Sequence, residues 1–216
     1  MGILRRGHSY DRRKLLSQAS KARARGRLKK AIRLYRRILA VEPEDPEVHR
    51  KVAPLLARSR QREAALTSFS QAVSGLMRRG FEDRALGVCR ETVQYFPHRA
   101  DVWEAIAQLE LKRSRTSDAV KALCEGRGHC SRRSQRGDAL RLLRRAHELA
   151  PDDADIAVDL ARLLRRSGAR LEARRLLAGF AARAKGPPSR RVAWARLCVD
   201  PTPARLLGWL RPGRSG

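Results

Sequence analysis

Apolar residues recur along the chain at helical spacing, and the same arrangement of them returns at a fixed interval. Between Gly26 and Pro43, apolar or small residues stand three and four positions apart, as on the buried face of one helix. They are Ala31, Leu34, Tyr35, Ile38 and Leu39. The arrangement returns around Ala85 and again around Ala139, each time 54 residues further on. Each copy ends at a proline, which cannot continue a helix: Pro43, Pro97 and Pro151.

A second set of small residues lies 34 positions after the first. Ala65 follows Ala31 by this interval, and the pairs Ala85/Ala119 and Ala139/Ala173 repeat it. Thirty-four residues is the length of one helix–turn–helix unit in several repeat proteins. The spacing therefore predicts an all-α chain of about 12 antiparallel helices. We expect them at 10–24, 28–41, 46–58, 62–78, 82–96, 100–113, 117–127, 135–149, 153–167, 170–184, 189–199 and 203–210.

These positions resemble the tetratricopeptide repeat. That family places large or apolar residues at positions 4, 7, 11 and 24 of a 34-residue window, small residues at 8 and 20, and proline at 32. The window that starts at residue 154 supplies Ala157, Leu160, Ala161, Leu164, Gly168, Ala173, Leu177 and Phe180. Windows that start at 12, 46 and 100 follow the same pattern, so the resemblance covers roughly 10–187. It implies a tetratricopeptide-like α-solenoid of antiparallel helix pairs, wound into a right-handed superhelix.

The domain organisation departs from the family in one respect. Windows that start at 66 and 120 also match, and they overlap the others, so the 54-residue step equals three helices instead of two. An odd number of helices per unit puts equivalent helices on alternate faces of an antiparallel stack. We expect an N-terminal tail at 1–9, a repeat array at 10–187 (about 12–45, 46–79, 80–99, 100–133, 134–153 and 154–187), capping helices with Trp194 and Trp209 at 188–211, and a tail at 212–216.

The charge of the chain favours an anionic partner. Lys and Arg number 49 against 22 Asp and Glu, a formal net charge of +27. Of these 49 basic residues, 41 are arginine. A GC-rich genome would explain the high proportion of arginine to lysine, although not the excess of basic over acidic residues. Many of the basic residues lie in three stripes, within Arg23–Arg37, Arg132–Arg145 and Arg162–Arg175. Nucleic acid is therefore an alternative partner, although these stripes lack aromatics that could stack on bases.

Candidate chemistry is sparse. Cys124, His129 and Cys130 are the one group with metal-ligand character, but their spacing fits no standard zinc motif, and we expect neither a metal nor another cofactor. Cys89 is expected in the core. The five histidines lie in no catalytic pattern, so we expect no enzyme. No signal peptide or membrane span is visible, and a cytoplasmic protein is the default expectation.

The resemblance implies a non-enzymatic scaffold or adaptor that binds a protein partner through the repeat groove. The carboxylate clamp that many family members carry at positions 5 and 9 of their first helices is missing; Glu104 and Gln108 occupy these positions in the window that starts at 100. Basic residues remain on the predicted first helices, and we expect them to bind an acidic peptide or protein segment. They are Arg23, Arg50, Arg58, Lys112, Arg162, Arg165 and Arg166.

Overall fold

The described chain is entirely helical. A computed structural model describes residues 10–183 and 190–199, which form eleven α-helices and one short 3₁₀ turn. The helices are α1 (Arg12–Ala24), α2 (Leu28–Leu39), α3 (Pro46–Arg58), α4 (Arg62–Arg78), α5 (Glu82–Tyr95), α6 (Ala100–Lys112), α7 (Thr116–His129), α8 (Arg136–Leu149), α9 (Ala154–Arg166), α10 (Arg170–Arg183) and α11 (Arg190–Val199), with the 3₁₀ turn at Arg133–Gln135. The predicted all-α stack is thus confirmed, and its expected last helix, 203–210, lies outside the described residues.

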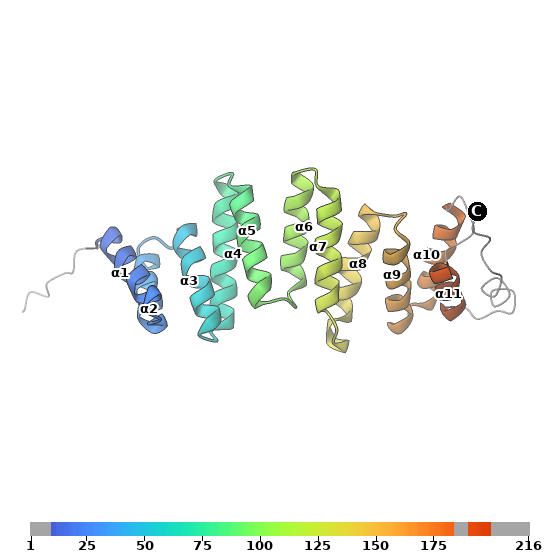
Figure 1. Ribbon diagram of the computed structural model, residues 1–216, viewed down its shortest axis with the longest axis horizontal. Coiled ribbons are helices and arrows are strands. Elements are labelled where there is room, and N and C mark those ends of the chain that lie inside the picture. The colour runs from blue at the N-terminus through green and yellow to red at the C-terminus, as the bar shows by residue number, and fades with distance from the viewer. Residues whose placement is uncertain (1–9, 184–189, 200–216) are drawn as a thin grey trace, which may run out of the picture. The chain divides into compact units, whose positions relative to one another are not determined.

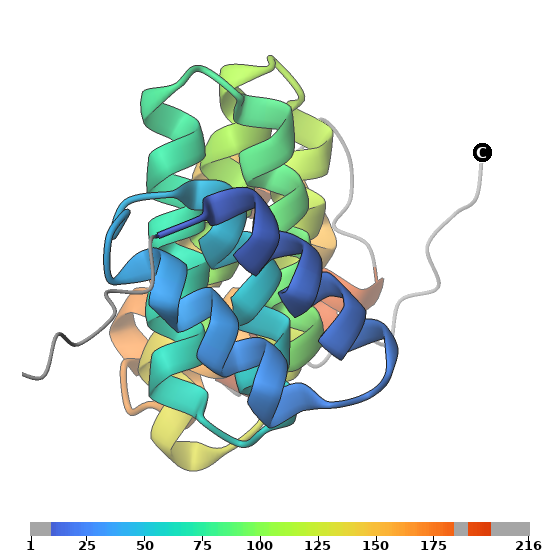
Figure 2. The same cartoon turned by 90° about the vertical axis from the view of Figure 1, so that its left-hand side faces the viewer.

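The chain divides into two compact units at Tyr95 and Phe96. The first unit contains α1 to α5 and the second α6 to α11 (Figure 1). Within each unit, consecutive helices pack against each other in chain order. In the first unit α1 and α2 form an antiparallel hairpin, which faces the viewer in Figure 2.

The backbone conformation of the turns follows the same repeat as the sequence. Among the described residues, five have positive φ, and they fall into two series with the 54-residue step. The series are Gly26 and Gly80, and Arg60, Ser114 and Gly168. Each of these residues closes a short turn, in which the following N–H reaches back five residues, as Arg27 N does to Ala22 O at 2.9 Å. The helices therefore end at matching places in each copy.

The core is built from the small residues that define the pattern. Ala31 and Ala85 have no exposed surface and Ala139 is 1% exposed; the second series, Ala65, Ala119 and Ala173, is fully buried. Large side chains fill the space beside them, among them Tyr35, Phe69, Leu123 and Leu177. Cys89, at 2% exposed, lies in the core as predicted. Alternation of small and large side chains is what lets antiparallel helices approach closely.

The link between α7 and α8 is shorter than the gap between the helices expected at 117–127 and 135–149. Helix α7 continues to His129, and only residues 130–132 precede the 3₁₀ turn at Arg133–Gln135. A Cβ on Gly126 would lie 2.4 Å from Cγ of Trp103 on α6. Glycine is needed inside this helix because the indole lies directly on its backbone.

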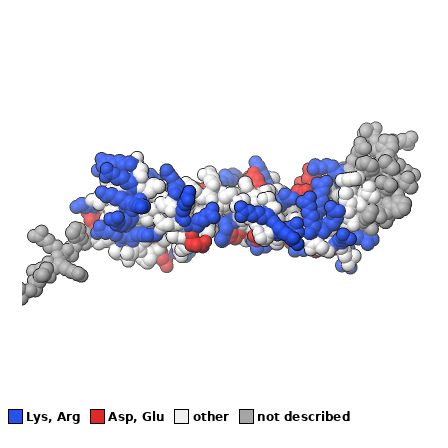
Figure 3. Space-filling view, turned by 90° about the horizontal axis from the view of Figure 1, so that it is seen from below, with Lys and Arg blue, Asp and Glu red and all other residues white. Residues whose placement is uncertain are grey.

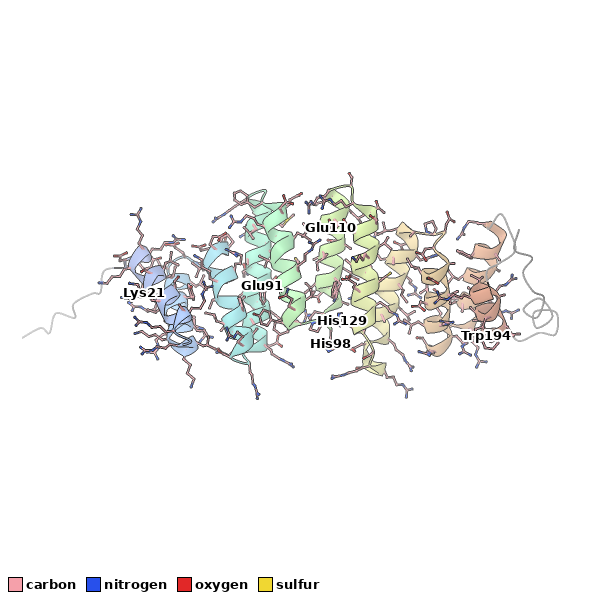
Figure 4. The ribbon with its side chains drawn as sticks, in the orientation of Figure 1. Lys21, Glu91, His98, Glu110, His129 and Trp194 are labelled. Atoms are coloured by element: carbon pink, nitrogen blue, oxygen red, sulfur yellow. The ribbon has the colours of Figure 1, made fainter. Side chains whose placement is uncertain are left out.

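The last described helix packs through small residues. Val192, Ala195 and Val199 of α11 are buried, and the helix contacts both α9 and α10. Trp194, which the sequence places in the predicted cap, is 43% exposed. Figure 4 labels it on α11. Trp209 lies outside the described residues.

Candidate functional site

Successive helices of the second unit alternate between two layers. Within each layer, ion pairs join neighbouring helices, which are next-but-one along the chain. In the layer of α6, α8 and α10, Arg141 Nε lies 2.6 Å from Glu104 Oε1, and Arg144 Nη2 lies 2.9 Å from Glu172 Oε1. In the layer of α7, α9 and α11, the pairs are Arg127–Asp159 at 3.8 Å and Asp155–Arg191 at 2.5 Å. Each layer therefore forms a continuous surface, one on either side of the unit.

A groove lies between α6 and α8. It has a volume of about 450 Å³, which is in the range of small-molecule and peptide side-chain pockets. Its floor is apolar, with Ala107 and Leu111 from α6 and Leu123 from the underlying α7. Its rim is charged and polar, formed by Glu104, Gln108, Arg141, Arg144, Arg145 and Glu148. An apolar floor inside a polar rim is the usual anatomy of a protein-binding surface.

The arginines of the rim form ion pairs but remain exposed. The side chains of Arg141, Arg144 and Arg145 are 54%, 49% and 51% exposed. Each has a carboxylate neighbour, and Arg145 Nη1 lies 2.7 Å from Glu148 Oε2 on its own helix. The hydrogen bond to Glu104 raises the pKa of the Arg141 guanidinium above its ordinary value. All three side chains therefore present fixed positive charge at the groove.

The first unit contains a similar ion pair between next-but-one helices. Arg84 of α5 pairs with Glu47 of α3 and so joins two next-but-one helices. Arg50 Nη2 also lies 3.3 Å from Glu47, and its charge acts on Glu91 of α5. Burial raises the pKa of Glu91, and the charge of Arg50 partly offsets that increase. Figure 4 shows Glu91 on α5.

The predicted partner-binding residues do not share one face. Arg162, Arg165 and Arg166 all lie on α9, in the layer opposite to α6, which carries Lys112. Arg165 Nη1 donates to Cys198 O at 3.3 Å, and Arg162 lies 3.8 Å from Asp159. The others belong to the first unit, with Arg23 on α1 and both Arg50 and Arg58 on α3. The odd number of helices per repeat causes this division, and the binding role of these residues stays a prediction.

The weak metal candidates are not arranged as ligands. Cys124 lies inside α7 and Cys130 is buried beyond its end; burial raises the pKa of both thiols and so favours their protonated forms. The exposed His129 ring instead stacks on Trp103, with 5.7 Å between centroids. His98 Nδ1 is 2.7 Å from His129 O, and the two imidazoles lie close together in Figure 4. Within residues 10–183 and 190–199, no three His, Cys, Asp or Glu side chains form a group that could hold a metal ion.

The groove does not follow from the sequence, although several of its residues belong to the motifs described above. Glu104 and Gln108 stand at family positions 5 and 9, but the expected binding set contains basic residues only. Arg141, Arg144 and Arg145 belonged to a basic stripe whose neighbours the sequence did not reveal. A signal was nevertheless present: Glu47–Arg84 and Glu104–Arg141 are both acid–arginine pairs 37 residues apart.

Comparison with known proteins agrees with the repeat pattern. The family model described as Tetratricopeptide repeat matches residues 133–192, which contain α8 to α10 and the start of α11. The predicted resemblance is therefore confirmed in the second unit. A search of curated proteins finds no relative that matches. No helix in the described part of the chain combines the length and apolar character needed to cross a membrane.

Solved structures of tetratricopeptide proteins are among the matches in three dimensions. A tetratricopeptide repeat protein from Parabacteroides merdae is 12% identical with a TM-score of 0.31, and the match covers 91% of this chain and 88% of that protein. Pseudomonas aeruginosa pilF is 16% identical with a TM-score of 0.28, and the match covers 87% of this chain and 82% of that protein. These TM-scores are below 0.5, so neither protein informs the function of this chain.

Proposed function

We propose that this chain is a non-enzymatic scaffold that binds a protein segment in the α6–α8 groove. Residues 133–192 match the tetratricopeptide repeat, a family that generally mediates protein–protein interactions. The observation that carries the proposal is the groove itself, whose apolar floor lies inside a charged rim. Family positions 5 and 9, which many relatives use for their ligands, line it here as Glu104 and Gln108.

The segment carries an apolar side chain. Leu111 is only half-buried on the floor, and Ala107 beside it leaves room above the fully buried Leu123. An apolar side chain seated there would remove the floor from water, at about 25 cal/mol for each Å² of apolar surface buried. Such an anchor supplies affinity, while the rim decides which segments are accepted.

The segment also carries acidic side chains. Three arginines line the rim, and each is bound to a carboxylate of this chain in an ion pair that is about half exposed. Exposed ion pairs contribute only about 0–1 kcal/mol, so an arginine can exchange its partner at little cost. An incoming Asp or Glu would gain a charge-assisted hydrogen bond to guanidinium in a partly desolvated groove.

Selection from a displayed peptide library tests the proposal. The purified chain is expected to enrich peptides that contain one apolar residue flanked by Asp or Glu. Affinity of a selected peptide is then measured by calorimetry against Arg144→Gln/Arg145→Gln, which removes two rim charges and leaves the floor intact. We expect at least roughly tenfold weaker binding, because two charge-assisted contacts are lost.

A matched control lies in the opposite layer. Arg127→Gln/Arg191→Gln changes the net charge by the same amount on α7 and α11. Both arginines also have carboxylate partners, and the groove proposal predicts no loss of affinity. If both double variants lose affinity equally, binding depends on net charge and the groove is not the site. Peptides enriched without acidic residues would contradict the assigned partner chemistry.

A further inference from the structure

The hairpin of α1 and α2 concentrates positive charge without acidic residues. Between Asp11 and Glu42 the chain contains twelve Lys and Arg side chains and no acidic residue. Of these, only Arg12 is half-buried; the other eleven are exposed. They are Arg13, Lys14, Lys21, Arg23, Arg25, Arg27, Lys29, Lys30, Arg33, Arg36 and Arg37. We call this set the hairpin cations; Figure 3 shows Lys and Arg crowded over this end of the chain, and Figure 4 labels Lys21.

None of the hairpin cations forms an ion pair with a described residue. The acidic side chains at the open end of the hairpin have other partners. Asp11 accepts from the backbone N–H of Lys14, and Arg12 binds both Glu42, at 2.9 Å, and Asp45. Glu44 binds Arg78 of α4 at 3.1 Å. The second unit differs: three of its arginines on α8 pair with Glu104, Glu148 and Glu172. A genome-wide preference for arginine would not by itself leave one hairpin uncompensated while another unit is paired.

A depression beside α2 gathers four of these charges. It has a volume of about 500 Å³ and is lined by Lys29, Ile32, Arg33, Arg36, Arg37, Ala40 and Gln61. No acidic side chain lines it. Arg36 Nη2 donates to Gln61 Oε1 at 2.7 Å, which orients that guanidinium at the wall. Three guanidinium groups and one ammonium group around one hollow are suited to phosphate oxygens, which arginine binds through two parallel hydrogen bonds.

The same surface lacks the groups that other polyanions would need. The one aromatic residue between 12 and 41, Tyr35, is fully buried, so no ring is available for the bases of a single strand. The large exposed apolar residues nearest to the hairpin are Tyr10 and Val41, both at the end away from the Gly26 turn, where Tyr10 Oη donates to Glu42. A membrane surface would call for apolar side chains among the cations.

We propose that the hairpin cations, centred on the depression beside α2, bind the phosphate backbone of a nucleic-acid duplex. Contact is made to phosphates and is independent of base sequence. This site lies in the first unit and shares no residue with the α6–α8 groove, so it adds a second binding activity to the proposed scaffold.

The charge density of the two partners is comparable. Helix α1 has 13 residues and is therefore about 20 Å long. A duplex carries about one negative charge for every 1.7 Å, or roughly 12 over that length. The hairpin offers eleven exposed cations, of which the four in the depression are placed to contact phosphate together. Four contacts predict that log K falls with log salt concentration with a slope of about −4.

Fluorescence anisotropy of the full chain with labelled duplexes tests the proposal. Double-stranded DNA and double-stranded RNA of about 20 base pairs are titrated at several salt concentrations, and the same sequences are titrated as single strands. The variant Arg33→Gln/Arg36→Gln/Arg37→Gln keeps good helix formers on α2 and removes three of the four charges. We expect duplex affinity to fall at least roughly tenfold and the slope to become shallower by about three.

The control variant Arg99→Gln/Arg183→Gln/Arg191→Gln removes the same charge from three arginines that already have acidic partners. Its duplex affinity is expected to stay within about twofold of wild type, because none of these residues belongs to the hairpin. Equal losses in the two variants would overturn the assigned site. Tighter binding to the single strands would overturn the duplex assignment.

Two further probes separate the duplex from other polyanions. Vesicles that contain phosphatidylserine and a polyglutamate peptide offer negative charge without a duplex backbone. Weaker retention of the chain by both probes than by the duplex, at equal salt, supports the proposal. Affinity for either probe that equals or exceeds duplex affinity, and that falls in Arg33→Gln/Arg36→Gln/Arg37→Gln, would overturn it. Loss of peptide selection by the α6–α8 groove would leave these measurements unaffected, so the two proposals fail separately.

Discussion

Glu104 and Arg141 face each other across the α6–α8 groove, with Arg141 Nε 2.6 Å from Glu104 Oε1. The two residues lie 37 positions apart and belong to next-but-one helices. An equivalent pair, Glu47 and Arg84, joins α3 to α5 in the first unit, and Asp155–Arg191 joins α9 to α11. Each pair joins two helices that are neighbours at the surface and are separated along the chain by one helix. The pair at the groove thus orients an arginine toward an incoming segment.

Removal of this pair should change stability only slightly. In a double-mutant cycle of Glu104→Gln and Arg141→Gln, we expect a coupling free energy below about 1 kcal/mol, because Arg141 is 54% exposed. Urea unfolding of the four proteins measures it. A coupling above about 2 kcal/mol would mean that Arg141 is committed to Glu104 and does not exchange partners.

Gly126 of α7 should not tolerate a methyl group. A Cβ there would lie 2.4 Å from Cγ of Trp103, so Gly126→Ala should lower the free energy of unfolding of the second unit by about 1–3 kcal/mol. Gly128→Ala, two residues further along the same helix, meets no atom within 4 Å and should be neutral or stabilise by up to about 1 kcal/mol. Thermal unfolding followed by circular dichroism compares the two variants; equal stability would contradict the packing of Trp103 on α7.

Acid should weaken the first unit through Asp45. Burial raises the pKa of this carboxyl, but the hydrogen bond from Arg12 and those from the amides of Val48 and Glu47 outweigh that effect, so the pKa lies below its ordinary value. The ionised form therefore stabilises the fold above the unfolded pKa of about 3.9, and this stability is lost as pH falls through the lower folded value.

In Asp45→Asn the helix cap is retained but the titration is removed. Its midpoint of thermal unfolding should be lower than that of wild type at pH 6, and the difference should shrink between about pH 4 and pH 2. Other carboxylates are common to both proteins and cancel in the comparison. A difference that stays constant through this pH range would show that Asp45 does not contribute through its charge.

Two residues of the left-handed turn series carry side chains where glycine would be less strained. Arg60 has φ of 60°, and its counterpart two copies later is Gly168, with φ of 88°. We expect Arg60→Gly to stabilise the chain by up to about 1 kcal/mol and Gly168→Ala to destabilise it by about 1 kcal/mol. Chemical denaturation measures both. The same sign of change in both variants would contradict the left-handed turn at these positions.

Much of the fold could be predicted because each turn has a local signal. Pro46 begins α3 and the short turns at Gly26 and Gly80 separate their helices, so helix boundaries followed from residues within one turn of each end. The close contact of Gly126 with Trp103 could not be predicted in this way. It depends on how α6 packs against α7, and a glycine inside a helix does not indicate in sequence which side chain lies on it.

The candidate groove could be predicted only in part. Its walls combine Gln108 with Arg145, and the contact between α6 and α8 depends on which layer each helix joins. The 54-residue step indicates that α6 and α9, as equivalent helices, face opposite ways. The expected binding residues follow the family's first helices instead, and so combine Lys112 with Arg162, which lie in opposite layers.

The position of a bound segment tests the central claim most directly. A photoreactive amino acid placed at Gln108, exposed at the rim of the α6–α8 groove, is compared with one placed at Glu125, exposed on α7 in the other layer. A selected acidic peptide is expected to crosslink at position 108, to fail at position 125, and to lose the crosslink when Arg144 and Arg145 are changed to Gln. Crosslinking at position 125 alone, or equally at both positions, would contradict the assignment of the groove.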